Sequence, residues 1–304
     1  MNAVITGGAG FIGSHLTERL HDAGHTVTVI DDLSNGKLDW ISDDVTVNEQ
    51  DISQPNALTS IITDDCDVIF HLAARKAVND EHPREQFQEN TTMTQEVITA
   101  AREHNVDDIF FTSSSTVYGE APRPTPEDYA PLEPISAYGA SKLACEGLLS
   151  AAAHTDDLNV YTVRFANIIG PRLRGAVIPD FIEKLRGDPD TLEILGDGRQ
   201  QKSYMHIEDC LDAMLHVYEH ADGPVATYNL GTRTTTSVDQ IAEIVSDEMS
   251  LSPTFEYTGG KRGWEGDVPK MRLSIEKLSA LGWTPSVEST PAVRQATQEL
   301  IQEM

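Results

Sequence analysis

Short runs of β-branched and other apolar residues alternate with helical patterns through the first half of the chain. The expected strands are Ala3–Thr6, Thr26–Ile30, Val45–Asn48, Val68–Phe70, Ile109–Thr112 and Val160–Arg164. The expected helices between them are Phe11–Ala23, Gln86–His104 and Ala137–His154. Strands that are apolar on both faces and joined by helices predict an α/β fold with a doubly wound parallel sheet, the Rossmann arrangement.

The alternation loosens after residue 167, where prolines recur and glycines cluster at 259–266. We therefore expect a Rossmann domain over residues 1–166 and a smaller, discontinuous substrate-binding region over 167–304. A helix at Asp209–His220 and a strand at Tyr228–Leu230 indicate that residues 203–232 return to the sheet.

The composition narrows the class of protein. Among 304 residues, 49 are acidic and 22 basic, which gives a formal net charge of −27. Such a surface repels nucleic acid and anionic membranes. Binding of a cationic partner is one interpretation of the charge. Because the carboxylates are spread along the chain, we favour the other, solvation in high salt.

Targeting and redox signals point to the cytoplasm. No run of 18 apolar residues is present, so no membrane span is expected. The chain enters a strand pattern directly after Met1-Asn2, without the basic and apolar regions of a signal peptide. Three widely spaced cysteines fit reduced thiols and predict neither a disulfide framework nor a zinc site.

A glycine-rich turn follows the first predicted strand. Gly7, Gly10 and Gly13 have the spacing at which backbone N–H groups and a helix N-terminus bind a pyrophosphate. Asp31 ends the second strand, where a carboxylate accepts ribose hydroxyls and repels a 2′-phosphate, so NAD is favoured over NADP. The same spacing recurs at Gly260, Gly263 and Gly266, but no amphipathic helix follows, and we reject that copy.

A tyrosine and a lysine stand one helical turn apart at Tyr138 and Lys142. A free phenol has a pKa of about 10, too high for a base at neutral pH. A nearby ammonium group and a positive nicotinamide ring both stabilise the phenolate. An exposed helix carrying both residues by accident is the alternative. The glycine motif and the hydroxyl cluster Ser113-Ser114-Ser115-Thr116 favour the catalytic interpretation.

With these motifs the chain resembles the extended short-chain dehydrogenase/reductases, and among them the UDP-glucose 4-epimerase-like nucleotide-sugar enzymes. The resemblance covers nearly the whole chain. The matching segments are 7–16, 31–35, 51–52, His71-Leu-Ala-Ala74 with Lys76, Asn90, 113–119, Tyr138 with Lys142, 164–167, 196–198 and 266–267.

The resemblance implies which residues contact the cofactor, NAD, and the substrate. For NAD these are Gly7, Gly10, Phe11, Ile12, Gly13, Asp31, Asp32, Leu33, Asn35, Asp51 and Ile52 at the adenine, Leu72, Ala73, Ala74 and Lys76 along the ribose and phosphates, Asn90, Tyr138, Lys142, and Phe165 at the nicotinamide. For a nucleotide sugar they are Ser114, Asn167, Arg174, Lys202, Arg262 and Asp267.

The implied reaction is a 4-epimerisation. Tyr138 takes the proton of the sugar 4-hydroxyl while C4 gives hydride to NAD+, Ser114 binds O4, and hydride returns to the opposite face. The related dehydratases and decarboxylases carry an acid after the Thr-Asp or Thr-Ser that precedes Val-Tyr-Gly, where this chain has Thr116. A hydroxyl does not replace a carboxylate as an acid and base near neutral pH. An epimerase is therefore expected.

The chain departs from the family pattern where the diphosphate is expected. Lys202 replaces an arginine and cannot make its bidentate grip. Trp264 stands where another arginine is usual, which leaves Arg262, Arg172 and Arg174 as candidates to bind the phosphates or to pair with surface carboxylates. Met271 occupies a position associated with acceptance of N-acetyl sugars, and that question stays open.

Three alternatives remain at this stage. A UDP-uronate 4-epimerase and a 4-keto-sugar reductase use the same scaffold, although Asp31 disfavours the NADPH that a reductase more often uses. A non-catalytic NAD-binding regulator belongs to another class and disagrees with intact Ser114, Tyr138 and Lys142. The family resemblance also implies a homodimer, with 86–104 and 137–154 as candidate interface helices.

Overall fold

The computed structural model describes residues 1–76, 82–263 and 266–304. Within this part the chain divides into two compact units. The first comprises Met1–Val117, Ser136–Arg164 and Met214–Tyr228, and the second comprises Tyr118–Ile135, Phe165–Ala213 and Asn229–Met304. Each unit is described by itself below. The assignment of cofactor binding and substrate binding to separate domains stays a prediction.

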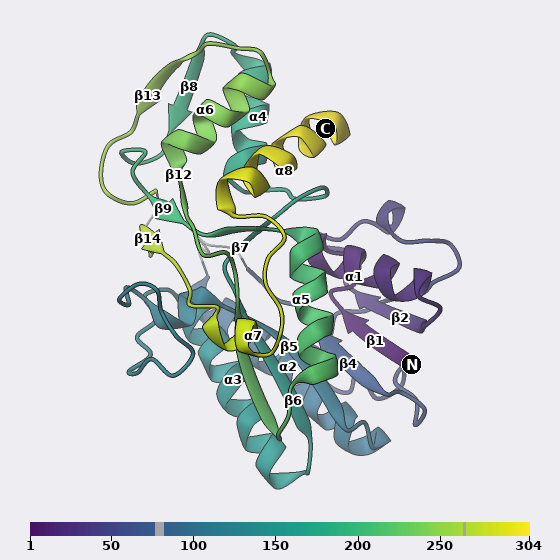
Figure 1. Ribbon diagram of the computed structural model, residues 1–304. Coiled ribbons are helices and arrows are strands. Elements are labelled where there is room, and N and C mark those ends of the chain that lie inside the picture. The colour runs from purple at the N-terminus through teal and green to yellow at the C-terminus, as the bar shows by residue number, and fades with distance from the viewer. Residues whose placement is uncertain (77–81, 264–265) are drawn as a thin grey trace. The chain divides into compact units, whose positions relative to one another are not determined.

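A seven-stranded sheet organises the first unit (Figure 1). Its strands, in sheet order, are β11 (Val225–Leu230), β6 (Asn159–Phe165), β5 (Asp108–Ser114), β4 (Val68–His71), β1 (Asn2–Thr6), β2 (Thr26–Asp31) and β3 (Thr46–Glu49). The pairs β1–β2, β1–β4, β2–β3 and β4–β5 are all parallel. The predicted doubly wound sheet is confirmed, and the strand predicted at 228–230 lies in it as the end of β11.

Helices cover both faces of this sheet. The helices of the first part of the chain are α1 (Phe11–Asp22), α2 (Pro83–His104) and α3 (Ala137–Thr155), with α5 at Ile207–His220 and the 3-10 turns η1 (Leu38–Trp40) and η2 (Ser115–Tyr118). Phe111 and Ile69 face α2 and α3, in one core with Val97 and Leu149. Phe70 and Phe110 alternate with them and stack on the other face, where Tyr218 of α5 packs against Phe70.

Sheet order places a crevice at the ends of β1 and β4. From β1 the chain proceeds outward to β2 and β3, whereas β4, β5 and β6 extend in the other direction. Ligands of doubly wound sheets bind outside the carboxyl ends of the strands where the order reverses. Gly7 follows β1 and Leu72 follows β4, so two predicted cofactor segments meet at this point.

Small sheets and several helices form the second unit. The strand pairs and triplets are β7 (Asn167–Ile169) with β10 (Tyr204–His206), β8 (Thr191–Ile194) with β13 (Thr254–Tyr257), and β9 (Gln201–Lys202) between β12 (Thr236–Ser237) and β14 (Lys270–Met271). The helices are α4 (Val177–Gly187), α6 (Val238–Glu248), the short α7 (Glu276–Ala280) and α8 (Ser289–Glu303). Helices α4, α6 and α8 pack against one another. In the described residues no helix is both long and apolar enough to span a membrane.

Candidate active site

The glycine-rich turn between β1 and α1 is closely surrounded by backbone atoms. A Cβ atom at Gly7, whose φ is +70°, would lie 2.7 Å from the backbone nitrogen of Ala73, and one at Gly13 would lie 2.1 Å from the carbonyl oxygen of Gly7. Only glycine fits these positions. Gly10 is the N-cap of α1, and in the described part of the chain no side chain caps this helix. Its N-terminal N–H groups therefore form a cradle that fits a pyrophosphate.

Asp31 lies at the end of β2, next to this turn. One carboxylate oxygen accepts a hydrogen bond from the Ala9 N–H and the other from the Leu33 N–H, each at 2.9 Å. Burial raises the pKa of the Asp31 carboxyl, and the same two N–H groups oppose the effect. Each oxygen keeps a further lone pair, so the group can still accept ribose hydroxyls. The residues present thus fit a dinucleotide of the NAD type.

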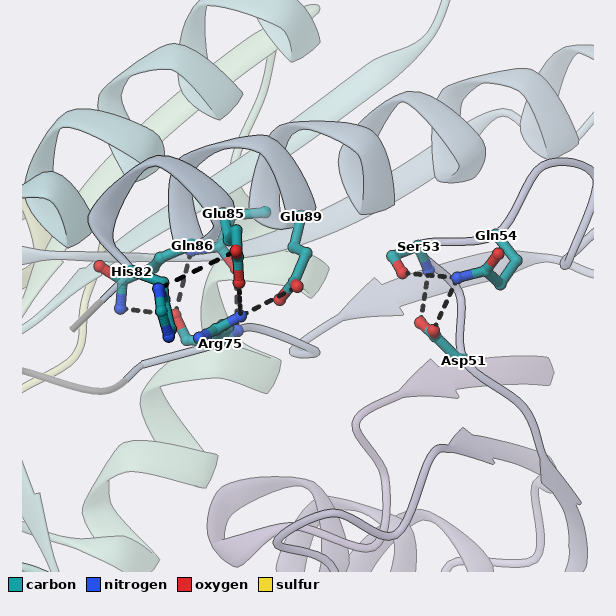
Figure 2. A network of polar contacts seen from close by, with 9 residues as sticks. Asp51, Ser53, Gln54, Arg75, His82, Glu85, Gln86 and Glu89 are labelled. Carbon is teal, nitrogen blue, oxygen red and sulfur yellow. Dashed lines mark hydrogen bonds and ion pairs between the residues drawn. The ribbon is translucent and has the colours of Figure 1, made fainter. Parts of the chain in front are cut away.

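Asp51 and the segment after β4 approach the same edge of the sheet (Figure 2). The Asp51 carboxylate accepts hydrogen bonds from the Ser53 N–H at 2.9 Å and from Gln54 Nε2 at 3.0 Å. Although partial burial raises the pKa of this carboxyl, hydrogen bonds from Ser53 and Gln54 bring it below its usual value. Asp32 caps its own turn in the same way, accepting from Ser34. The Asp51 carboxylate therefore stays charged at neutral pH.

Asn90 of α2 holds the 72–76 segment instead of pointing to open solvent. Its side-chain oxygen accepts from the Arg75 N–H at 2.8 Å, and its amide nitrogen donates to the Arg75 carbonyl at 3.1 Å and to Ser141 Oγ at 2.9 Å. Both amide hydrogens are therefore used within the protein. The predicted direct contact of Asn90 with NAD stays a prediction, while its hold on Arg75 and Ser141 links the cofactor segment to α3.

The side chain of Arg75 strengthens this link. The Arg75 guanidinium lies 2.9 Å from Glu89 and 3.7 Å from Glu85, both on α2 (Figure 2). The Gln86 side chain donates a hydrogen bond to the backbone carbonyl oxygen of Arg75. Lys76 is the last residue described before a gap at 77–81 and is exposed. The sequence interpretation named Lys76 but not Arg75, because no helical or strand periodicity relates Arg75 to the acidic residues of α2.

The tyrosine and lysine of α3 occupy the positions that their spacing predicts. Ser136 caps the helix by accepting a hydrogen bond from the Gly139 N–H at 3.1 Å, and Tyr138 lies in the first turn. Lys142 is buried, and its Nζ donates to the Thr112 carbonyl of β5 at 2.8 Å. The same Nζ is 4.6 Å from the Phe111 ring centre and 5.9 Å from that of Tyr138. The same Tyr-x-x-x-Lys spacing occurs at Tyr257 and Lys261, but Tyr257 ends strand β13 and this pair is not helical.

Burial shifts the protonation of this pair. It lowers the pKa of Lys142 to about 8, although Cys145 and Glu146 act in the opposite direction. It also raises the pKa of the Tyr138 phenol, to which the Cys145 thiol contributes. In the protein alone, the effect of burial on the pKa of the Tyr138 phenol is thus larger than the stabilisation of the phenolate that we expect from Lys142. A further positive charge, such as that of an oxidised nicotinamide, is needed to poise the phenol as a base.

Two serines of the hydroxyl cluster at the end of β5 have different hydrogen-bond partners. Ser113 is buried and donates to the Glu146 carboxylate at 2.5 Å. Ser114 is half-buried, and its oxygen accepts from the Thr116 N–H at 3.2 Å and from the Thr116 hydroxyl at 3.0 Å. The Ser114 hydroxyl hydrogen remains available to a ligand oxygen. This geometry agrees with the catalytic assignment of Ser114 and gives Ser113 a place in the protein interior.

Two other residues of the core surround this pair without titrating near neutral pH. His71 is buried at the end of β4 between Thr6 Oγ1, at 2.8 Å, and Thr94 Oγ1, at 3.2 Å. Burial and the charge of Lys142 lower its pKa to about 3, so this imidazole is neutral and structural. The Cys145 thiol donates to the Asn90 carbonyl, and burial raises its pKa.

In the second unit, three of the cations predicted to bind a diphosphate are engaged with carboxylates. Lys202 lies 2.6 Å from Asp267, a buried residue, and Arg174 lies 2.8 Å from Glu303. Arg262 pairs with Glu120 and donates to the Asp267 carbonyl. Trp264 lies outside the described residues. The pairing of Arg174 and Arg262 with carboxylates was the alternative left open by the sequence.

The remaining predicted residues lie on strands β6, β7 and β14. Asn167 begins β7, and its N–H donates to the Ser203 carbonyl at 3.1 Å. Met271 of β14 is buried and lies opposite Lys202 of β9 in the parallel register. Phe165 ends β6 and is also buried. Their contacts with a substrate or cofactor stay predictions.

Comparison with known proteins gives one consistent result. The profile of the NAD dependent epimerase/dehydratase family matches residues 3–231. The UDP-glucose 4-epimerase of Mycolicibacterium smegmatis is 31% identical over 316 residues, which cover 98% of each chain. A solved UDP-galactose 4-epimerase is 38% identical over the full length of both chains, with a TM-score of 0.91. MoeE5, solved with NAD and either UDP-glucuronic acid or UDP-glucose, is 30% identical with a TM-score of 0.85 and covers at least 98% of both chains.

Proposed function

The chain belongs to the NAD dependent epimerase/dehydratase family, and we propose that it is a nucleotide-sugar 4-epimerase of the UDP-glucose/UDP-galactose type. The observation that carries the proposal is the placement of the half-buried Tyr138 and the buried Lys142 one turn apart on α3, with Lys142 bound to β5 two residues before Ser114. A tyrosine, a lysine and a serine are thereby gathered at the carboxyl end of the sheet. The epimerase relatives and the glycine cradle support this assignment.

In the proposed reaction each residue handles one atom. When bound, NAD+ supplies the hydride acceptor and later the hydride donor for sugar C4. Tyr138 removes the proton of the sugar 4-hydroxyl and returns it to O4 after the sugar has turned over. Ser114 donates its free O–H to O4, and the Lys142 ammonium group lowers the cost of charge on the phenol. Burial of Lys142 against β5 keeps water from its ammonium group.

For the substrate, we infer that the diphosphate competes with carboxylates for cations of the second unit. Lys202 and Arg262 are the candidates, since Asp267 and Glu120 already hold them in fixed positions. A diphosphate makes stronger charge-assisted hydrogen bonds than an exposed carboxylate partner such as Glu120. Asn167 and Arg174 are retained as further contacts, and a homodimer through α2 and α3 and a cytoplasmic location remain predictions of the same proposal.

Product analysis tests this function. Purified protein in high-salt buffer is given UDP-galactose, first alone and then with NAD+. We expect UDP-glucose to form without net NADH, and the reaction to fall at least a thousandfold in Tyr138→Phe, since the acid/base is lost. A non-catalytic NAD-binding module would not be affected by this substitution. Full conversion by Tyr138→Phe would refute the assigned role of Tyr138.

UDP-uronate epimerisation is the second candidate, favoured by the similarity to MoeE5 in complex with UDP-glucuronic acid. It needs a cation or hydroxyl group at the sugar carboxylate. Running UDP-glucuronate in the same assay separates the two, because the uronate enzyme converts it and leaves UDP-galactose unchanged. Thr116 in place of an acid continues to disfavour dehydration and decarboxylation.

A further inference from the structure

A buried carboxylate stands one helical turn beyond the lysine of α3. Tyr138, Lys142 and Glu146 are spaced four residues apart, so they lie along one face of the helix. The Glu146 and Arg164 side chains are only 11% and 7% exposed. No part of the proposed reaction uses either of them directly. Charges are rarely buried in this way unless they are paired and have a task.

Three hydrogen bonds fix this carboxylate. Arg164 of β6 donates from Nε at 3.0 Å and from Nη2 at 2.7 Å, a bidentate grip. Ser113 of β5 donates through its hydroxyl at 2.5 Å. Glu146 is therefore bound to two neighbouring strands at once, and its position relative to the sheet is closely determined.

The same strand is gripped at the preceding residue by the lysine. Lys142 Nζ donates to the Thr112 carbonyl at 2.8 Å, and Glu146 accepts from Ser113. Consecutive residues of β5 are thus bound by consecutive turns of α3. The next residue of β5 is Ser114 and the preceding turn of α3 holds Tyr138, so these two contacts set the register between the acid/base and the hydroxyl that meets the sugar.

We propose that Glu146, held by Arg164 and Ser113, is a positioning residue that fixes the register of α3 against β5 and keeps Lys142 charged. The inference rests on the proposed function of Tyr138, Lys142 and Ser114. Glu146 touches neither substrate nor cofactor. Its effect on the reaction passes through the ammonium group of Lys142 and through the placement of Tyr138.

Electrostatics adds a measurable consequence. The groups facing Lys142 are Tyr138, Cys145 and Glu146 on α3, the neutral His71 on β4, and Arg164 of β6 behind Glu146. Burial lowers the pKa of Lys142 to about 8, and Glu146 opposes this fall. Because Lys142 must be protonated for the reaction, activity is present below this pKa and is lost as the pH rises through it.

The test replaces each partner of the Glu146–Arg164 ion pair in turn. In Glu146→Gln the buried Arg164 is left uncompensated, so the alkaline limb of kcat should move to lower pH by about one unit. In Arg164→Met the carboxylate is left uncompensated, and the limb should move to higher pH. Asp156→Asn is the matched control: it removes one negative charge next to the end of α3, about 21 Å along the helix from Lys142, and should leave the limb in place.

Purely structural roles predict a different result. Loosened packing would lower kcat at every pH in both variants, and the alkaline limbs of their pH profiles would not move in opposite directions. Limbs that shift in the same direction, or not at all, would overturn the proposal. Should Glu146→Gln not fold, the upward shift in Arg164→Met decides the question alone.

A second measurement separates this inference from the proposed function. The protein has eight lysines, and the 13C resonances of their Cε atoms report each pKa, with Lys142→Arg identifying the signal of Lys142. We expect the Lys142 titration to move down in Glu146→Gln and up in Arg164→Met. If the wild-type protein converts no UDP-sugar, the proposed function fails while these titrations still test Glu146. If conversion proceeds and the titration does not move, only the present inference fails.

Discussion

At the scale of single residues, Asp31 shows how one carboxylate serves both the fold and the choice of cofactor. It accepts hydrogen bonds from the N–H groups of Ala9 and Leu33, which fix the glycine-rich turn and the end of β2. Its remaining lone pairs can accept hydrogen bonds from the hydroxyl groups of the adenosine ribose that is expected there. A fixed negative charge there opposes a 2′-phosphate far more than a hydroxyl.

We expect Asp31→Asn to bring the affinities for NAD+ and NADP+ closer together by about tenfold, which corresponds to ~1.4 kcal/mol. The amide keeps one acceptor oxygen for the turn but loses the charge that repels a 2′-phosphate. Dissociation constants of both cofactors, measured by titration calorimetry, check this. Asp39→Asn, an exposed change of the same charge, is the control. An unchanged preference in Asp31→Asn would show that another group selects the cofactor.

Residues on one helix or turn could be identified from the sequence, whereas partners across the fold could not. Tyr138 and Lys142 are four apart, so their common face follows from helical geometry alone. The bond between Glu146 and Arg164 joins α3 to β6, and its partners are 18 residues apart with no periodic relation. Likewise, nothing in the spacing of Asn90 and Arg75 predicts that one holds the backbone of the other.

At the scale of elements, long and periodic segments were predicted to within a few residues. Helix α3, predicted as 137–154, runs over Ala137–Thr155, and α2 begins at Pro83, three residues before its predicted start. The strands of the second unit were mostly missed because they are short: β9, β12 and β14 have two residues each, too few for any alternation. Their pairing is set by tertiary contacts instead.

Helix α2 is expected to contribute to cofactor binding through Asn90. We expect Asn90→Leu to weaken NAD+ binding by roughly tenfold and to lower the free energy of unfolding by about 2 kcal/mol, because the N–H and C=O of Arg75 lose their buried partner. The cofactor segment 72–76 is then no longer held against α2 and α3. Fluorescence titration with NAD+ and urea unfolding measure the two effects.

The matched control on the same helix is Thr99→Ala. Its hydroxyl donates to the Gln95 carbonyl of the same helix, so neither quantity should change appreciably. A variant of Asn90 that loses stability but binds NAD+ normally would show that the 72–76 segment keeps its position without this amide.

At the scale of the whole molecule, charge dominates. The formal net charge is −27, and the ion pairs of the described residues engage many of the cations, among them Arg75, Arg102, Arg174, Arg262 and Arg294. Most of the carboxylates therefore repel one another across the surface. Individual exposed pairs contribute little to stability, so they do not offset a charge excess of this size.

Salt should therefore stabilise this protein. The way in which the unfolding temperature varies with salt concentration shows whether screening of surface charge is the cause. Raising KCl from about 0.1 M to about 1 M shortens the Debye length from about 10 Å to about 3 Å, which removes most of the repulsion between surface carboxylates. We expect the midpoint of thermal unfolding to rise steeply over this range and to level off above it. A linear rise that continues at higher concentration would indicate exclusion of salt from apolar surface instead. A midpoint that does not depend on KCl, with full activity in dilute buffer, would show that the acidic surface serves another purpose, such as the binding of a cationic partner.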